Sequence, residues 1–254
     1  TLSAPEAPMI MGSSDTTVMV NVRAGYEYAI RDVENGGSIV WITSGEFTGL
    51  SPAKVYHVYC RIAETETTFA SPISEYSEVV TDKSYPTEVP EKPVVIAKNS
   101  YSITLKAVPG VEFSLDGEHF TRSNVIKDLI PGTTYSVVCR YRETDTSYAS
   151  FNSEEIYVDI IPDKITSREY KIDELNKFIT EVPMGTSVGM LVSNLDYGKY
   201  AKVYDGSKAM GKLTSVSTGN KVVIDDEYGN RVEYTVIVKG DVNGDGIVTV
   251  TDML

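Results

Sequence analysis

The sequence predicts a mainly β protein that is built from several small modules. Three observations support this prediction: short runs in which apolar and polar residues alternate, frequent turns of Gly, Pro, Asn and Asp, and an internal repeat in the first two thirds of the 254 residues. The alternation is typical of half-buried strands. Strands of about six residues with frequent turns indicate antiparallel β-sandwiches, because each sheet must bury its apolar face against another layer.

The internal repeat aligns two stretches without a gap. GLSPAKVYHVYCRIAETETTFASPISE at 49–75 matches DLIPGTTYSVVCRYRETDTSYASFNSE at 128–154, at an offset of 79 residues. Further upstream, AGYEYAI matches PGVEFSL at an offset of 85 residues. The first copy therefore has about six extra residues, which we place in the polar stretch 34–38 because loops absorb insertions at little cost.

The second copy contains LIPGTTYSVVCRY, which resembles the L-x-P-G-T-x-Y-x-V stretch of fibronectin type III domains. The resemblance implies two tandem immunoglobulin-like β-sandwiches, at residues 1–84 and 85–162. It also implies a tyrosine corner in each, in which the hydroxyl groups of Tyr56 and Tyr135 bind backbone upstream. The RxxETxTxxAS tail of each copy resembles modules that are common in surface proteins of Gram-positive anaerobes.

The two cysteines, Cys60 and Cys139, occupy equivalent positions in separate repeats. A disulfide needs Cα atoms within about 7 Å, so we expect two reduced thiols that pack inside the two sandwiches. A nucleophilic thiol needs a neighbouring base. His57 lies three residues before Cys60 and so on the opposite face of the predicted strand, and His119 lies in a predicted turn. With no other catalytic constellation in the sequence, we expect that the chain is not an enzyme.

The residues that follow the repeats are predicted to form different structures. Residues 81–93 contain three prolines and are predicted to be a stiff linker. Residues 163–239 predict a small α+β module of strand, strand, helix and three strands, with Thr186 or Ser187 as the helix cap. This part resembles small modules that directly precede dockerins in clostridial surface proteins.

Acidic and aromatic residues offer two further candidate sites. Asp225, Asp226 and Glu227 stand together at the end of a predicted strand. Paired catalytic carboxylates come from separate elements that face a cleft, so we predict a solvated turn here instead. The single tryptophan, Trp41, is either a packing residue of a core or sheet edge, which we expect, or a platform for a stacked ligand.

The C-terminal stretch GDVNGDGIVTVTDML contains the strongest chemical signal in the chain. Side chains with oxygen atoms alternate along a twelve-residue loop, with Gly246 at the sixth position where the backbone must turn sharply. Calcium takes six to eight oxygen ligands, and such a loop provides them. The expected calcium ligands are Asp241, Asn243, Asp245, the Ile247 carbonyl group, Thr249 and Asp252. The alternative is an Asn-Gly and Asp-Gly turn without a metal.

The pattern DVNGDG-x-V-x-x-x-D resembles a dockerin repeat, which identifies residues 240–254 as the first half of a type I-like dockerin. The resemblance implies a cohesin domain as partner, with contacts at the tenth and eleventh loop positions, here Val250 and Thr251. A dockerin has two such repeats, each followed by a helix, and this sequence stops within the first. We therefore expect weak calcium binding and cohesin binding only by the complete dockerin.

Composition limits the function further. The net charge of −13 argues against nucleic acid and anionic membrane surfaces, because both need clustered Lys and Arg. No apolar run approaches the roughly 20 residues that cross a bilayer. We expect a monomeric, extracellular or cell-surface bacterial segment, trimmed from a longer chain, that acts as a structural spacer in a surface or cellulosome-type protein of polysaccharide metabolism. The alternative is an adhesive module that binds a carbohydrate or host ligand.

Overall fold

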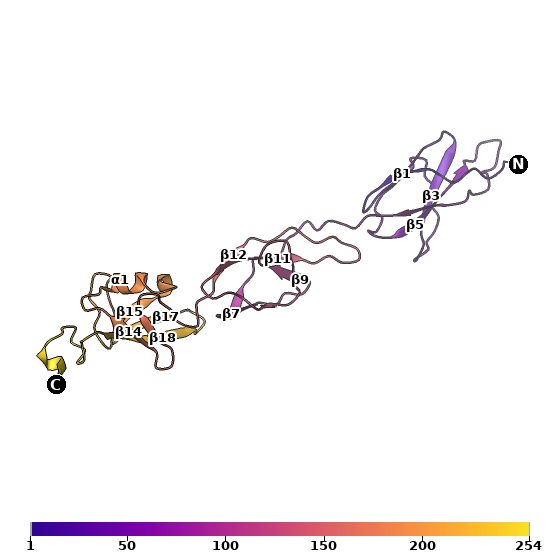
Figure 1. Cartoon of the computed structure of the whole chain (residues 1–254). Helices are drawn as coiled ribbons and strands as arrows, with labels where there is room; N and C mark the ends of the chain where they lie inside the picture. The colour runs from indigo at the N-terminus through magenta and orange to yellow at the C-terminus, as the bar shows by residue number, and fades with distance from the viewer. Residues whose placement is uncertain (1, 254) are drawn as a thin grey trace. The chain divides into compact units, whose positions relative to one another are not determined.

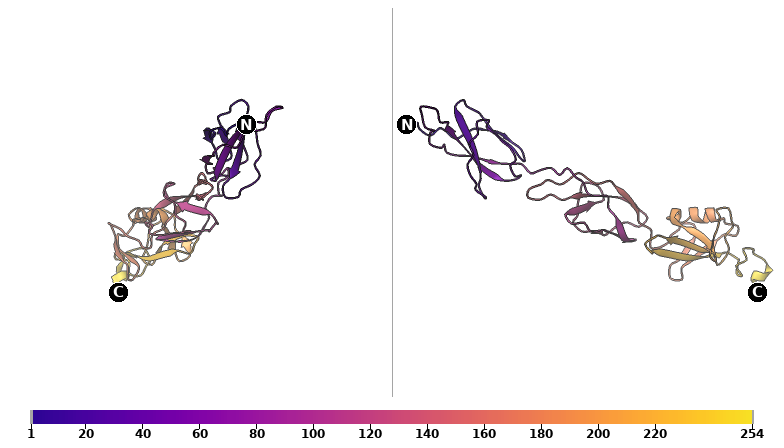
Figure 2. Two further views of the ribbon diagram at one scale, coloured as in Figure 1. Left: turned by 90° about the vertical axis from the view of Figure 1, so that its right-hand side faces the viewer. Right: turned by 180° about the vertical axis from the view of Figure 1, so that it is seen from behind.

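The computed structural model describes residues 2–253 and is mainly β, as the sequence predicts (Figures 1 and 2). The chain divides into two compact units. One unit comprises Thr1–Pro90 with Arg140–Asn152, and the other comprises Glu91–Cys139 with Ser153–Leu254.

The first module, residues 10–80, contains two three-stranded antiparallel sheets. Their orders are β1-β2-β4 and β3-β5-β6. The strands are β1 (Ile10–Ser13), β2 (Val18–Val20), β3 (Tyr26–Asp32), β4 (Glu46–Phe47), β5 (Val55–Ile62) and β6 (Ser77–Val80). Val18 and Phe47 of one sheet and Tyr28, Val58 and Cys60 of the other form one hydrophobic core. Burial on both sheets makes this module a two-layer structure.

The second module, residues 95–159, repeats the arrangement. Its three-stranded sheets have the orders β10-β8-β7 and β12-β11-β9. The strands are β7 (Val95–Asn99), β8 (Ser102–Leu105), β9 (Val111–Ser114), β10 (Val125–Ile126), β11 (Thr134–Tyr141) and β12 (Ile156–Asp159). Each module thus has six assigned strands, and isolated bridges such as Tyr28–Ile42 and Phe113–Thr121 add to the pairing.

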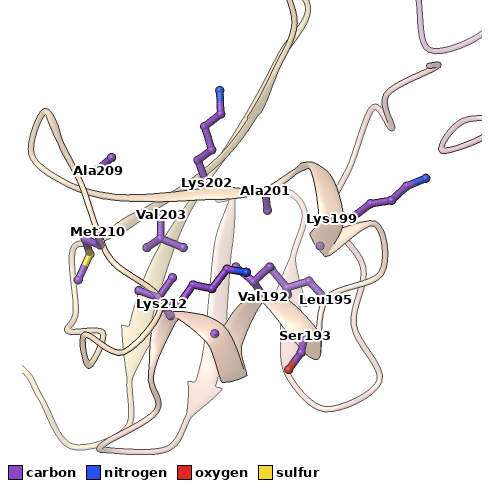
Figure 3. Close-up of a pocket in the computed structure, with 13 residues that line it drawn as sticks. Val192, Ser193, Leu195, Lys199, Ala201, Lys202, Val203, Ala209, Met210 and Lys212 are labelled. Atoms are coloured by element: carbon purple, nitrogen blue, oxygen red, sulfur yellow. The ribbon is translucent and has the colours of Figure 1, made fainter. Parts of the chain in front are cut away.

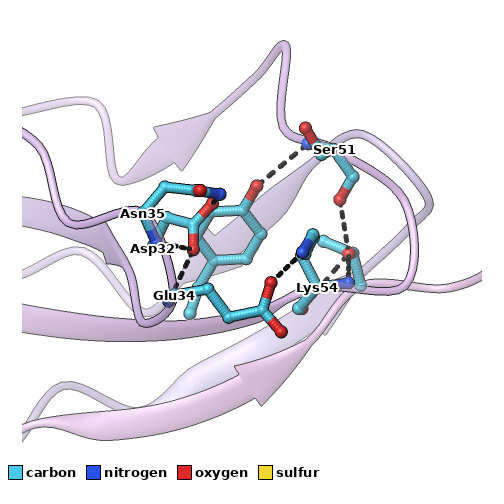
Figure 4. A network of polar contacts seen from close by, with 7 residues as sticks. Asp32, Glu34, Asn35, Ser51 and Lys54 are labelled. Carbon is cyan, nitrogen blue, oxygen red and sulfur yellow. Dashed lines mark hydrogen bonds and ion pairs between the residues drawn. The ribbon is translucent and has the colours of Figure 1, made fainter.

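Both modules contain the tyrosine hydrogen bond that the resemblance implies. The Tyr56 hydroxyl accepts from Ser51 N at 2.9 Å, and the Tyr135 hydroxyl accepts from Ile130 N at 2.9 Å. Figure 4 shows Ser51 in this network, beside Lys54, whose ammonium group pairs with Glu34. Each tyrosine hydroxyl group accepts a hydrogen bond from a backbone N–H group in the turn before the long strand. This bond fixes the path of the chain where it enters that strand.

Both cysteines are free and buried, in agreement with the expected reduced thiols. Cys60 Sγ lies 3.2 Å from Glu6 O, and Cys139 Sγ lies 3.3 Å from Glu91 O. His57 is only partly buried in the alternating pattern of β5, on the face opposite to that of Cys60. Burial raises the pKa of the Cys139 thiol, which is typical of an unreactive packing residue.

The third module, residues 171–238, forms a six-stranded sheet in the order β13-β14-β18-β17-β15-β16. All neighbouring strands are antiparallel except β14 and β18. The strands are β13 (Lys171–Asp173), β14 (Phe178–Val182), β15 (Lys202–Asp205), β16 (Lys208–Ala209), β17 (Lys221–Asp225) and β18 (Arg231–Val238). Helix α1 (Val188–Ser193) lies over this sheet, as Figure 1 and the right-hand view of Figure 2 show.

The cap of α1 is Ser187, one of the two residues that the sequence predicts, and its side chain accepts from Met190 N. Val188 and Leu191 are buried on the face of α1 that meets the sheet. The short strand β16 and the 3-10 helix η1 (Gly198–Tyr200) are not among the predicted elements. Two and three residues are too short for a periodic pattern to reveal them.

Candidate functional site

The predicted calcium loop begins directly after β18, where Asp241 is almost completely buried. Its carboxylate accepts hydrogen bonds from Thr218 N at 2.9 Å, Gly244 N at 2.8 Å and Gly246 N at 3.3 Å. The Thr218 hydroxyl donates to the Asp241 carbonyl group at 2.6 Å. The first loop position is therefore held by the third module, while the rest of the loop lies at the surface.

The twelfth loop position folds back onto the start of the loop. Asp252 Oδ1 accepts from Val242 N at 2.8 Å and Asn243 N at 3.2 Å, and Asp252 Oδ2 accepts from Thr249 N at 2.8 Å. These backbone donors hold the pKa of the Asp252 carboxyl group below its ordinary value. Asp252 lies in the 3-10 helix η2 (Val250–Met253). The loop is thus closed end to end.

The middle of the loop places its polar side chains beside one another. Asn243 Nδ2 donates to Asp245 Oδ2 at 3.0 Å, and Ile247 N donates to Asp245 Oδ1 at 2.9 Å. The Thr249 and Thr251 hydroxyl groups lie 2.7 Å apart. Within residues 2–253, no three His, Cys, Asp or Glu side chains form a group that could hold a metal ion.

The donor set of the loop fits calcium by type, since it supplies carboxylate, amide, carbonyl and hydroxyl oxygens. Among the residues that the structure describes, Asp241, Asp245 and Asp252 have no ion pair with Lys, Arg or His. Their oxygen atoms accept backbone hydrogen bonds instead. The prediction of a metal site therefore stays a prediction, supported by the closed loop and its ligand types.

In the acidic turn after β17, Glu227 is exposed, as the sequence predicts for a solvated turn, but Asp226 is not. Asp226 Oδ2 lies 3.5 Å from Lys98 Nζ, and only 9% of each side chain is exposed. Asn230 Nδ2 donates to Lys98 O at 2.9 Å, and the Lys98 ammonium group lies 5.3 Å from the centroid of the Tyr228 ring. We call these residues, Lys98 with Asp226, Tyr228 and Asn230, the turn contact.

Sequence reasoning missed the turn contact because Lys98 lies more than one hundred residues before Asp226. A buried carboxylate is retained only when it is paired and hydrogen-bonded. Asp226 meets that condition, since its Oδ1 accepts from Tyr228 N at 2.9 Å and Asn230 N at 3.1 Å. Within the second unit, the turn contact joins the second module to the third.

Within the first unit, part of the predicted linker pairs with a β-hairpin. Ser84 forms a parallel bridge with Ser147, in which Ser84 N donates to Thr146 O at 3.0 Å and Tyr148 N donates to Ser84 O at 2.9 Å. The Tyr85 and Tyr148 rings stack with centroids 4.5 Å apart. We call residues 83–85 together with the hairpin residues 143–148 the linker contact.

A charged pair completes the linker contact. Lys83 Nζ donates to Glu143 Oε1 at 2.6 Å and to Thr144 O at 2.8 Å. Such an exposed pair contributes little by itself, about 0–1 kcal/mol, but with the bridge and the stacked rings it fixes one register. The signal in the sequence is KSY within a proline-rich stretch, where a basic, a small and an aromatic residue interrupt the linker composition.

The third module also contains a pocket of about 480 Å³ between α1, η1 and β15 (Figure 3). Val188, Val192, Leu195, Val203 and Met210 make its walls mainly apolar. Its lining includes three lysines but no acidic and no aromatic residue.

The three lysines of this pocket differ in their contacts. Lys202 pairs with Asp225 at 3.2 Å, and the Lys199 ammonium group lies 4.5 Å from the centroid of the Tyr200 ring. Lys212 extends toward Val192 across the pocket in Figure 3. A mainly apolar pocket with few polar groups is the usual form of a small-molecule site, and this volume is sufficient for one.

Trp41 is partly buried, and the Arg61 guanidinium group lies 4.3 Å from the centroid of its ring. Because Arg61 also pairs with Glu27 at 2.8 Å, the ring is covered by a held side chain, in line with edge packing. The most exposed aromatic side chains are Phe69 at 85% and Phe151 at 81%. Neither residue lies in an assigned strand, helix or turn.

The comparisons with known proteins leave the family open. No protein-family model matches the chain, and a search of curated proteins finds no match either. None of the helices between residues 2 and 253 has the length and apolar character that crossing a bilayer requires.

Proposed function

We propose that the chain is a non-catalytic spacer segment of an extracellular or cell-surface bacterial protein of cellulosome type, which presents a catalytic or adhesive domain of its parent protein. The proposal rests on the turn contact. Modules in one chain move relative to each other by default. The buried Lys98–Asp226 pair, at 3.5 Å, opposes such motion between the second and third modules, and it supports a role in setting the spacing of successive modules.

Backbone ¹⁵N relaxation tests this spacer role. A spacer predicts that the second and third modules tumble with one common correlation time, and that Lys98→Met separates the two values. Binding to insoluble polysaccharides provides the second measurement, and the spacer proposal predicts that the chain does not bind them. Two independent correlation times in the wild-type chain would contradict the spacer proposal, as would saturable binding to a polysaccharide.

We also propose that residues 240–254 are the first calcium repeat of a dockerin-like element. Asp241, Asn243, Asp245, Thr249, Asp252 and the Ile247 carbonyl group would hold the ion. Calcium would offset two of the three carboxylate charges and keep the loop in one conformation for a protein partner. Val250 is 75% exposed, and Thr251 is exposed too. Both are therefore accessible to a cohesin-type domain once the second repeat completes the dockerin.

Calorimetry tests the calcium proposal on this chain. We expect one weak calcium site and no comparable magnesium binding, because magnesium requires strict octahedral geometry. Asp245→Ala removes a ligand and should abolish the binding heat. Asp205→Ala removes an exposed carboxylate elsewhere in the third module and should change nothing. Equal calcium binding by all three proteins would show that the loop is not the site.

A second candidate function is ligand binding, which the pocket of the third module favours. Its walls lack the aromatic rings on which sugars stack, and its only charged lining residues are lysines. An apolar ligand with one acidic group fits this lining better than a carbohydrate does. Titration with decanoate, followed by amide shifts around Met210, tests the candidate. Saturable shifts that Lys212→Ala weakens would support ligand binding, and their absence at millimolar decanoate would exclude it for this class.

A further inference from the structure

The first module contains a hairpin equivalent to the one that forms the linker contact. Residues 61–71 (the first hairpin) align without a gap with 140–150 (the second hairpin). Their backbone bonds agree: Thr65 N donates to Thr68 O at 2.9 Å, and Thr144 N donates to Ser147 O at 2.9 Å. The two hairpins therefore share the hydrogen bond that closes their turn.

The second hairpin is occupied by residues 83–85, and each group that receives them has a counterpart in the first. Ser84 hydrogen-bonds to the Thr146 carbonyl group and to the Tyr148 N–H group. The counterparts of these two groups are the Thr67 carbonyl group and the Phe69 N–H group. The Ser147 hydroxyl donates to Ser84 O at 3.2 Å, and Thr68 is its counterpart in the first hairpin.

The charged and aromatic groups recur as well. Glu143, which accepts from Lys83 Nζ at 2.6 Å, corresponds to Glu64. Tyr148, whose ring stacks on Tyr85 at 4.5 Å, corresponds to Phe69. The first hairpin therefore has an acceptor for a basic side chain and a ring for an aromatic one, at the same spacing.

Within residues 2–253, nothing occupies these groups in the first hairpin. The Phe69 N–H group and the Thr67 carbonyl group make no hydrogen bond, and Glu64 has no ion pair. The Phe69 side chain is 85% exposed, although a ring of this size contributes most when it is buried. An edge with unpaired N–H and C=O groups is a template for an added strand.

We infer that the first hairpin is a docking site for an extended segment from another modular chain, with a basic, a small hydroxyl and an aromatic residue in succession. The segment would pair in parallel with Thr67–Phe69, as Ser84 pairs with Ser147. Its basic residue would reach Glu64, and its ring would stack on Phe69. The linker of the same chain is not the occupant, because its residues 83–85 already pair with the second hairpin.

The probe that tests this inference is an acetylated, amidated peptide with the sequence of residues 82–87, DKSYPT. The ¹⁵N-labelled whole chain is titrated with it, and amide shifts are recorded. We expect a saturable shift of the Phe69 amide, because its N–H group gains a hydrogen bond. Phe69→Ala removes only an exposed ring and should weaken binding about fivefold, the usual effect of losing one aromatic pair. Glu64→Gln should also weaken it.

Two controls separate docking on the first hairpin from displacement at the second. Tyr148→Ala should leave the Phe69 shift and its midpoint unchanged, and a peptide with Ala in place of Tyr should bind as weakly as the wild-type peptide binds Phe69→Ala. The inference is overturned by shifts confined to residues 143–148, by no shift at millimolar peptide, or by a dimer of the chain that forms without peptide.

Discussion

The first and second modules share several internal hydrogen bonds, such as those of the Tyr56 and Tyr135 hydroxyl groups, but they differ where the second module meets the next part of the chain. At one such position, Ser13 in β1 corresponds to Lys98 in β7. The Ser13 hydroxyl donates to Val80 O at 3.5 Å, and Lys98 Nζ donates to the equivalent carbonyl group, Asp159 O, at 2.6 Å. Ser13 is exposed, whereas the Lys98 side chain continues into the turn contact.

A second difference concerns one turn. Ala53 has φ of 52° and Gly132 has φ of 76°, so both copies use the left-handed conformation at this position. A Cβ atom on Gly132 would lie 2.0 Å from the Tyr197 ring. The first module tolerates alanine here, while the packed ring in the second leaves room only for glycine. Repeats thus keep the residues that build the module and change those that meet a neighbour.

The largest effect that would sharpen this comparison is expected at Lys98. Lys98→Met leaves the Asp226 carboxylate buried without its cation, so we expect a loss of about 3 kcal/mol in the free energy of unfolding. Urea denaturation measures it. Ser13→Met at the equivalent exposed position should change the free energy of unfolding by less than about 0.5 kcal/mol.

A double variant separates the ion pair from the packing around it. Lys98→Met with Asp226→Asn removes both charges and keeps the acceptor for the turn, so most of the stability should return. If the double variant is as unstable as Lys98→Met alone, the loss does not come from the unpaired carboxylate.

The next effect concerns the turn that contains Ala53 in the first module and Gly132 in the second. Gly132→Ala forces the new methyl group against Tyr197, and we expect a loss of about 2 kcal/mol. Ala53→Gly, the reverse change in the first module, should stay within about 1 kcal/mol, because relief of the left-handed backbone offsets the added chain entropy. Thermal denaturation of both variants tests the pair, and equal losses would mean that the Tyr197 ring is not the cause.

The tyrosine corners should show a smaller difference. Tyr56→Phe leaves Ser51 N without its acceptor beside a buried ring, at a cost of about 1 kcal/mol. Tyr135 is less buried than Tyr56, and Ile130, whose N–H group it accepts, is 64% exposed. Water can replace that acceptor, so Tyr135→Phe should cost about half as much. A larger loss from Tyr135→Phe in urea denaturation would contradict this ranking.

The smallest effect distinguishes two similar turns by their pH response. Asp32 accepts from Asn35 Nδ2 at 2.8 Å, and Asp116 contacts His119 Nδ1 at 2.7 Å. The hydrogen bond to Asp116 raises the pKa of His119 above its ordinary value of 6.5. The contact is therefore fully present below pH 6.5 and is lost as pH rises through the raised pKa.

NMR titration between pH 5 and 9 follows the two turns separately. The amides of 116–119 should shift with the His119 midpoint, and those of 32–35, which contain no histidine, should not. Asp116→Asn should return the His119 midpoint toward 6.5, because the largest cause of the shift is the bond to that side chain. An unchanged midpoint would assign the shift to another group.

Local patterns predicted much of this fold. The alternation of apolar and polar residues predicted the long strands β5 and β11. The aligned repeat predicted that Tyr56 and Tyr135 have the same role, and both accept a backbone hydrogen bond. The residues Thr186 and Ser187 predicted the start of α1. Each of these signals lies within a few residues of the structure that it specifies. The lengths of the shortest elements, such as β16, depend on packing and left no periodic signal.

Contacts over long sequence distances could not be predicted. The sequence predicts a solvated turn for Asp226, because nothing near it in sequence indicates burial. Its cation comes from Lys98 in β7. The pocket between α1 and β15 likewise depends on how the helix rests on the sheet. The candidate calcium loop differs from the Asp226 contact and from the pocket. All its proposed ligands lie within twelve consecutive residues, so the sequence alone shows their spacing.

The two buried thiols make each repeat its own reporter of local opening. Cys60 and Cys139 are 2% exposed, and each sulfur lies against the carbonyl group of the segment that precedes its module. An alkylating reagent can reach them only when that module opens. Alkylation followed by mass spectrometry would therefore yield two opening rates from one sample. The ratio of the two rates would show how strongly contacts with neighbouring parts of the chain stabilise one module relative to the other, since the two modules are otherwise built alike.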